Sequence, residues 1–328
     1  MKRMLLLIST LLISLSSAAT IGGYGELHWD MEGESMDFHR FIIFYGHAFD
    51  DEWSMKAEVE IEHNMVGADY GGYLALEQGY VNYFNGTWGW KGGVILAPVG
   101  IINITHEPPT FLSVERPAYH KHIIPTTWFG NGMGFYGGMG DFSWEVTLME
   151  DFLGQEILDN RAIRSGRGKG DDSHATSLTK IFTIGWTGMD GLRVGGSYTM
   201  NEAPTDDENN PLDLTLMEIN TTYSKNNIHT VFEWATGNFD NGTVDWTSNG
   251  YYLDLGYNLG DMMGMEGKTL MPWFRTSTYT KDDSSADNDV DVTLFGVTFK
   301  PNSDVSIKFE TGEEGGSDVM RMGVGYMF

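Results

Sequence analysis

Histidine, carboxylate and basic side chains gather in residues 101–131, and any chemistry of this chain would be sought there first. His120 and His122 share one side of an extended segment, where two imidazoles could bind a metal ion, but the sequence offers no third ligand. His106 and Glu107 are followed by two prolines, so this pair cannot lie on the helix that a zinc protease requires. We therefore expect no metal site in this segment.

Glycine motifs elsewhere match the sequence patterns of nucleotide-binding loops but lack the structural context that such loops require. Gly132, Gly134 and Gly137 fit the dinucleotide fingerprint, but no helical pattern follows, and glycine-rich strands produce this spacing by chance. Gly267, Lys268 and Thr269 match the last three residues of a phosphate-binding loop, but the first glycine of that motif is missing. Cysteine is absent, which excludes thiol catalysis and disulfides, and no Gly-x-Ser-x-Gly occurs. We expect no catalytic residue and no cofactor.

The charged side chains can instead act on ions through their electric field. Residues 101–131 are close to neutral and become positive where their histidines protonate. The candidate residues there are Glu107, Glu115, Arg116, His120, Lys121 and His122. The next long connection holds the densest basic cluster of the chain, which would either draw in anions or pair with phosphate groups of lipopolysaccharide and nearby aspartates. Its members are Arg161, Arg164, Arg167 and Lys169.

The elements that position these residues are strands of about ten residues with alternating apolar and polar side chains. The apolar faces are rich in aromatic residues and the opposite faces carry full charges, as expected for strands with lipid on one side and a lumen on the other. The carboxylates predicted to face the lumen are Glu58, Glu60, Glu62, Glu145, Glu233 and Asp254. Three of the predicted strands, 37–48, 74–84 and 212–223, alternate poorly.

The sixteen predicted strands are 21–30, 37–48, 53–63, 74–84, 90–99, 132–140, 142–151, 178–188, 190–200, 212–223, 227–237, 249–259, 269–279, 289–300, 303–311 and 319–328. Short turns alternate with long polar connections between them, and 260–268 breaks this rule. This pattern predicts an all-β fold, a transmembrane antiparallel β-barrel with short periplasmic turns and long external loops. After the N-terminus no apolar run is long enough for a membrane-spanning helix.

The two ends of the chain indicate export. Lys2 and Arg3 precede a short apolar stretch that closes with small residues, so we interpret residues 1–19 as a signal peptide and 20–328 as one barrel domain. The last predicted strand is amphipathic and ends at Phe328, a terminal aromatic of the kind read by the outer-membrane assembly machinery. The predicted location is the cell outer membrane. The net charge of -26 makes nucleic acid a poor partner.

The connection 100–131 is too apolar and too rich in proline for a loose surface loop, which indicates a functional role. Its motifs are Pro98–Asn103, His106–Pro109, Glu115–Pro117 and Ile123–Trp128. This stretch resembles the third-loop region of porins related to the phosphate-selective porin O and P family. The resemblance implies a sixteen-stranded barrel, a homotrimer and a third loop folded into the lumen. It does not imply phosphate selectivity, because no arginine ladder can be matched among only 20 lysine and arginine residues.

The sequence thus predicts a porin, a water-filled channel for passive diffusion of small hydrophilic solutes or ions, with anions such as phosphate among the candidates. We expect weak selectivity from a mixed-charge constriction in which Arg116 and Lys121 oppose carboxylates of the wall. Its partners would be membrane lipid, lipopolysaccharide and the permeating solutes. One alternative is a closed structural or adhesive barrel. The other is a barrel enzyme, for which Ser197 and His229 offer a pair that only coordinates can judge.

Overall fold

The computed structural model describes residues 19–67, 69–284 and 288–328, so all but the last residue of the predicted signal peptide lies outside the described residues. Sixteen strands are found in the described part of the chain. They are β1 (Thr20–Asp30), β2 (Ser35–Ala48), β3 (Trp53–Glu62), β4 (Leu74–Phe84), β5 (Trp88–Leu96), β6 (Phe129–Met139), β7 (Phe142–Met149), β8 (Thr179–Met189), β9 (Leu192–Ala203), β10 (Leu212–Lys225), β11 (Ile228–Asp240), β12 (Asp245–Tyr257), β13 (Thr269–Thr280), β14 (Asp289–Asn302), β15 (Val305–Glu314) and β16 (Ser317–Met327).

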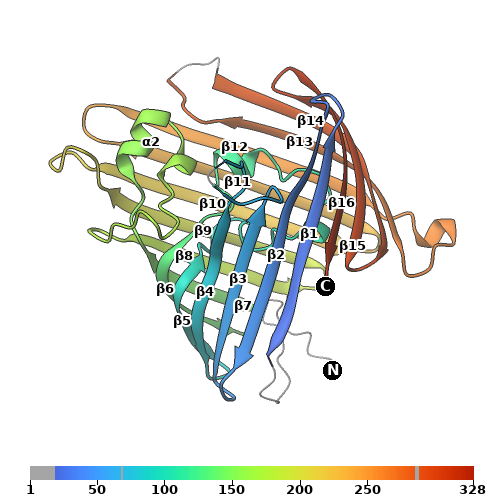
Figure 1. The fold of residues 1–328 in the computed structure, drawn as a ribbon, viewed down its shortest axis with the longest axis horizontal. Coiled ribbons are helices and arrows are strands. Elements are labelled where there is room, and N and C mark those ends of the chain that lie inside the picture. The colour runs from blue at the N-terminus through green and yellow to red at the C-terminus, as the bar shows by residue number, and fades with distance from the viewer. Residues whose placement is uncertain (1–18, 68, 285–287) are drawn as a thin grey trace.

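Each strand pairs antiparallel with the next one along the chain, and β1 pairs with β16 to close the barrel (Figure 1). The closing pairs run from Tyr24 opposite Met327 to Asp30 opposite Arg321. Each predicted strand overlaps an observed one, and the predicted barrel is confirmed. The largest shift is at the start of β12, which was predicted at residue 249 and begins at Asp245.

The outer face of the barrel is apolar and aromatic. Mid-strand side chains such as Phe135, Phe182 and Phe295 are about half exposed there, whereas many charged residues of the same sheet, such as Glu58, Glu233 and Arg275, are buried. Trp53, Tyr83 and Trp88 form a chain of rings on this face, with neighbouring ring centroids 5.0 and 5.4 Å apart. A continuous apolar surface around a closed sheet requires an apolar solvent.

Two of the three poorly alternating strands contain β-bulges. In β2, Phe38 and His39 together oppose one residue of β1, between the pairs Glu26–Arg40 and His28–Asp37. In β4 the extra residue is Glu77, which lies between the residues paired with Glu58 and Val59. A bulge shifts the inward and outward phase of a strand by one residue, so no single period-two pattern fits these sequences.

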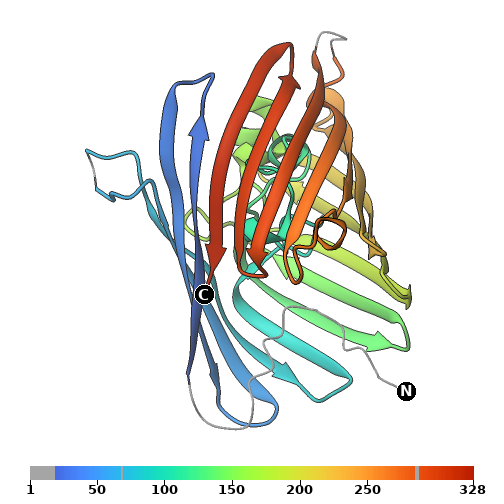
Figure 2. The ribbon, with the colours of Figure 1, turned by 90° about the vertical axis from the view of Figure 1, so that its right-hand side faces the viewer.

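The third such strand, β10, has a regular register but an apolar inner face. Leu212, Leu214 and Leu216 are inward and fully buried, and Glu218 follows them on the same face. Their burial requires apolar partners inside the barrel. Figure 2 shows these partners, the connections between β5 and β6 and between β7 and β8, lying within the ring of strands.

The connections alternate in length over most of the barrel, but two predicted long ones are short: 312–318 is reduced to Gly315 and Gly316, and 238–248 to residues 241–244, because the flanking strands extend into them. The connections after even-numbered strands are short: β10 and β11 are joined by Asn226 and Asn227 alone, both with positive φ, as a two-residue hairpin turn requires. The exception at 258–268 is confirmed, and it holds a 3₁₀ helix, η3 (Asp261–Met263). None of the helices in the described ranges combines the length and the apolarity needed to cross a membrane. We call the end of the barrel with the longer connections the long-loop end.

Placing a charge on the apolar outer face tests whether lipid surrounds that face. Phe295→Arg, in the middle of β14, is expected to lower the free energy of unfolding from a lipid bilayer by about 2–4 kcal/mol. The matched control is Ile228→Arg, at the first residue of β11, where the expected loss is about 0–1 kcal/mol. Urea unfolding of vesicle-inserted protein measures both, and equal losses would contradict a membrane-centred outer face.

Candidate functional site

The connection from β5 to β6, residues 97–128, enters the barrel and crosses its interior, and we call it the crossing loop. It contains the 3₁₀ helix η1 (Pro108–Thr110) and the short helix α1 (Tyr119–His122). Asn103 closes it at its base: its Nδ2 donates to the carbonyls of Ala97 (2.8 Å) and Trp128 (3.0 Å), and its Oδ1 accepts from the Trp128 amide (2.7 Å). One buried side-chain amide thus joins the two ends of the loop.

The middle of the crossing loop, at Leu112–Val114, is held by wall side chains from the C-terminal strands. Lys308 of β15 donates to the Ser113 carbonyl at 2.7 Å, and Glu310 accepts from the Val114 amide at 2.8 Å. Thr298 of β14 donates to the Leu112 carbonyl at 2.5 Å. These are bonds from charged or hydroxyl side chains to loop backbone, and they satisfy polar groups that water cannot reach.

Strands on other sides of the barrel hold the rest of the loop. His28 of β1 bonds Glu115 at 2.7 Å, and Glu233 of β11 bonds His120 at 3.0 Å. Glu58 of β3 lies 3.3 Å from His106. Apolar contacts complete the anchoring, because Tyr119, Ile123, Ile124 and Trp128 belong to the same buried cluster as the inward leucines of β10.

A second loop, residues 150–178, packs onto the crossing loop, and we call it the capping loop. It holds the helix α2 (Gly154–Asn160) and the 3₁₀ helix η2 (Ile163–Gly166), visible at the long-loop end in Figure 1. Ile157 and Ile163 are buried against the crossing loop's cluster, and the Phe152 ring lies 4.8 Å from that of Trp128. The two loops form one apolar body inside the barrel.

The predicted basic cluster belongs to the capping loop. Arg164 donates to the Thr126 carbonyl, and Arg167 donates to the Thr127 carbonyl at 2.5 Å, so both guanidinium groups bind the end of the crossing loop. Arg161 lies over the Trp246 ring at 4.2 Å, and Lys169 over Tyr73 at 5.0 Å. Burial and the charge of Arg164 lower the pKa of Arg167 to about 9, which leaves it charged at neutral pH.

The six residues predicted at a constriction divide into two groups. His106 and His120 are buried anchors. Glu107, Glu115, Arg116 and His122 are partly exposed, and Lys121 is exposed on α1. Arg116 also donates to the His106 carbonyl at 3.1 Å, which holds its guanidinium beside the loop backbone. The exposed members are those that solvent and ions can reach.

The surroundings of the crossing loop lower the pKa values of two of its histidines and of Glu115. Burial lowers the pKa of His120 to about 3, and burial with the charges of Lys281, Lys121 and Arg164 lowers that of His122 to about 4. For Glu115, burial favours the neutral form, but the hydrogen bond and charge of His28 outweigh it and lower the pKa to about 2. Neither His120 nor His122 therefore adds positive charge in mildly acidic solution.

The six predicted wall carboxylates point inward, and most have cationic partners. Arg40 lies 3.4 Å from Glu60, and Lys91 lies 2.8 Å from Glu145. Arg275 makes a two-bond pair with Asp254, at 2.6 and 2.7 Å. Glu58 and Glu233 bind the crossing loop as described above, and Glu62 stays partly exposed.

Sequence reasoning missed other anchors. Glu77 accepts from Thr127 Oγ1 at 2.9 Å, but it occupies the β4 bulge, where the alternating pattern fails. Lys308 and Glu310 were visible as the polar face of their strand, yet nothing in the sequence paired them with the crossing loop. The enzyme pair is not assembled: Ser197 bonds Glu218 at 3.0 Å, whereas His229 bonds Ser224 at 2.7 Å.

Comparison with known proteins supports the fold. No family model matches the chain. An uncharacterized protein of Aquifex aeolicus is 28% identical over 96% of this chain and 81% of its own length.

Solved structures with the same fold include OmpF of Salmonella typhi (TM-score 0.65, 12% identity, 95% of this chain and 97% of that one). The anion-selective porin of Comamonas acidovorans gives a TM-score of 0.64 at 10% identity, over 95% of this chain and 100% of that one. OmpT of Vibrio cholerae, with its loop L8 deleted, gives a TM-score of 0.63 at 11% identity, over 95% of this chain and 99% of that one. The chain thus has the closed sixteen-stranded fold of outer-membrane porins.

Removing the Asn103 amide tests its role at the base of the crossing loop. Asn103→Ala leaves two buried carbonyls and one amide without their partner, so we expect a loss of about 2 kcal/mol in the free energy of unfolding. Denaturant unfolding in detergent measures it. Asn131→Ala is the control, because the Asn131 side chain makes only long contacts of 3.3–3.4 Å at an exposed edge. Equal losses would refute the role given to Asn103.

The depressed pKa of His120 predicts acid sensitivity. Its folded pKa of about 3 lies below the ordinary 6.5, so the stability from burying neutral His120 is complete above pH 6.5 and is lost as pH falls towards 3. At pH 4 the loss from this residue is about 3 kcal/mol. Unfolding measured from pH 7 to 4 should be less pH-dependent in His120→Gln than in the parent protein. An identical pH profile would contradict the buried neutral imidazole.

Proposed function

We propose that this chain is an outer-membrane diffusion channel for small hydrophilic solutes and ions, and that it is not an enzyme. The observation that carries the proposal is the position of the crossing loop: it lies inside a closed barrel whose outer face suits lipid and whose inner face is charged. A segment held across a lumen by wall side chains narrows the passage, and the charges beside it then act on solutes at short range.

Charges of both signs meet around Arg164. Burial and the nearby charges of Arg116 and Arg40 lower its pKa, whereas Tyr73 and Glu62 act in the opposite direction. Cations of the crossing loop and β2 therefore act electrostatically on this residue of the capping loop, and so does a wall carboxylate. We infer a mixed-charge constriction with weak ion selectivity, in which Arg116 and Lys121 supply positive charge opposite wall carboxylates. Phosphate and other anions are candidate solutes of this passage.

The setting of the channel follows from the same proposal. Residues 1–19 would direct export, and Phe328 would serve as the assembly signal of the last strand. Lipid and lipopolysaccharide would surround the barrel, and we propose a homotrimer. One of the structures that share this fold, OmpT of Vibrio cholerae, is described as a trimer form.

Single-channel recording in a planar bilayer tests the channel directly. Stable ohmic steps, often in threes, are the expected result, and the reversal potential under a KCl gradient gives the sign of the selectivity. Folded protein without conductance would overturn the proposal in favour of a closed structural or adhesive barrel. The apolar packing of the crossing loop against the capping loop is the observation that favours this second candidate.

Removing positive charge at the inferred constriction should shift selectivity towards cations. In Arg116→Ala/Lys121→Ala we expect a measurable move of the reversal potential in the cation direction, because two positive groups beside the passage are lost. Lys225→Ala is the control: it removes one positive charge next to a short turn, where Lys225 pairs with Asp190 at 3.0 Å. Unchanged conductance and reversal potential in the double variant would count decisively against this placement.

A further inference from the structure

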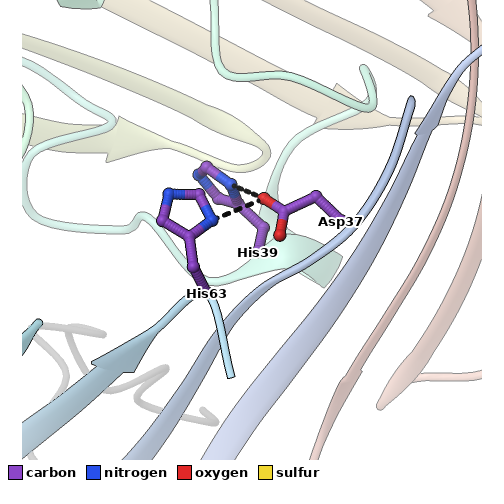
Figure 3. A group of neighbouring side chains, drawn as sticks. All are labelled: Asp37, His39 and His63. Carbon is purple, nitrogen blue, oxygen red and sulfur yellow. Dashed lines mark hydrogen bonds and ion pairs between the residues drawn. The ribbon is translucent and has the colours of Figure 1, made fainter. Parts of the chain in front are cut away.

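Two histidines and an aspartate meet at the long-loop end of β2 and β3 (Figure 3). Oδ2 of Asp37 lies 3.0 Å from Nδ1 of His39 and 2.8 Å from Nδ1 of His63. The two imidazole rings are nearly perpendicular, with centroids 5.4 Å apart. Two ring nitrogens thus approach one carboxylate oxygen, and all three ligand atoms lie within 4.8 Å of one another. This donor set is typical of transition-metal sites.

Two local departures from regular strand geometry build this group. The bulge at Phe38 and His39 places Asp37 opposite His28 of β1, on the inner face of the wall. His63 follows the last residue of β3 with a left-handed backbone (φ 56°), and its amide donates to the His39 carbonyl at 3.2 Å. This turn brings the His63 imidazole back over β2, so residues far apart in sequence share one carboxylate.

Neighbouring side chains hold the group in place and leave it open to solvent. The His28 ring stacks on His39 at 4.9 Å with an interplanar angle of 14°. Both nitrogens of His28 are engaged, by Glu115 at 2.7 Å and Glu26 at 3.1 Å, so His28 supports His39 and is not itself a ligand. The exposed fractions of the Asp37, His39 and His63 side chains are 36%, 23% and 40%. An ion arriving from the long-loop end can therefore reach all three.

We propose that Asp37, His39 and His63 form a binding site for a divalent transition-metal ion at the mouth of the barrel. Zn²⁺ bonds imidazole nitrogen and carboxylate oxygen at about 2.0–2.2 Å, which places ligand atoms of a tetrahedral site about 3.3 Å apart. The two separations from Asp37 Oδ2 need to open by about 0.3 and about 0.5 Å to reach this value, and all three ligand atoms lie within 4.8 Å of one another. Water completes the coordination. Nitrogen donors favour Cu²⁺, Ni²⁺ and Zn²⁺ over Mg²⁺ and Ca²⁺, which prefer oxygen.

The charge of the surroundings agrees with this assignment. The carboxylates of Glu26 and Glu115 act on His39 and oppose the charge of Arg40. The turn between β1 and β2, which precedes Asp37 in sequence, carries Glu32 and Glu34, and the chain as a whole has a net charge of -26. A negative mouth raises the local concentration of cations. The other carboxylate-histidine group of the described residues, Glu58, Glu77 and His106, is fully buried, and its members already bind the loops or one another. We assign that group to anchoring.

Isothermal titration of the untagged, folded protein in detergent tests the site without reference to conductance. ZnCl₂ is expected to bind with one equivalent per chain, and MgCl₂ to give no saturable binding. His63→Ala and Asp37→Asn should each weaken Zn²⁺ binding by more than about tenfold, since each removes a ligand. The matched control is His174→Ala, because His174 is also exposed and lies 3.5 Å from one aspartate, Asp172, without a second histidine.

Electron paramagnetic resonance with Cu²⁺ identifies the ligands directly. The parent protein should show hyperfine coupling to two nitrogens, and His39→Ala or His63→Ala should show one. Heat-modifiable electrophoretic mobility confirms that each variant is folded. Absence of saturable Zn²⁺ binding, equal affinity in His63→Ala, or loss of binding in His174→Ala would each overturn the proposal. Because binding is read on folded protein, a failure here is distinct from a failure to conduct.

Discussion

A backbone that runs through the interior of a barrel must find hydrogen-bond partners in the wall, and this constraint organises the molecule. Buried amides and carbonyls without partners cost about 1–3 kcal/mol each. The crossing loop meets that demand with Asn103 at its base and with side chains such as Lys308 and Glu310 along its length. Charged residues that look unfavourable inside the structure are therefore the partners that make the loop possible, and their burial follows from its presence.

The β-bulges have a part in this organisation that regular strands could not play. In β4 the bulge adds Glu77 to the inner face, where it binds Thr127 of the crossing loop. In β2 the bulge sets Asp37 and His39 beside His28, which in turn binds Glu115 of the same loop. Each bulge changes which residues face inward without interrupting the closed sheet. Irregular strands thus supply both anchoring groups and the histidine cluster at the mouth.

The sequence predicted the sixteen strands because alternation and turn residues are local signals, and it marked the third long connection by its prolines and apolar residues. It placed the wall carboxylates on the inner face but could not pair Glu233 with His120, since that contact depends on the path of a loop. Nor could it pair Asp254 with Arg275, since that contact depends on the register between β12 and β13. His63 escaped notice because its role requires a left-handed turn and a bulge in another strand. In β10 the inward face carries leucines instead of polar residues, so its sequence does not alternate between apolar and polar. The apolar loop residues that pack on these leucines are visible only in the structure.

The anchors of the crossing loop also link its placement to the order of assembly. His28 is in the first strand and Glu310 in the fifteenth, on the two sides of the seam where β1 meets β16. A loop that takes partners from both can adopt its final position only when the chain ends have come together. Such contacts join residues far apart in sequence and form late in folding. The crossing loop therefore acts as a tie across the seam, and opening the barrel there would also break its contacts with His28 or with Glu310.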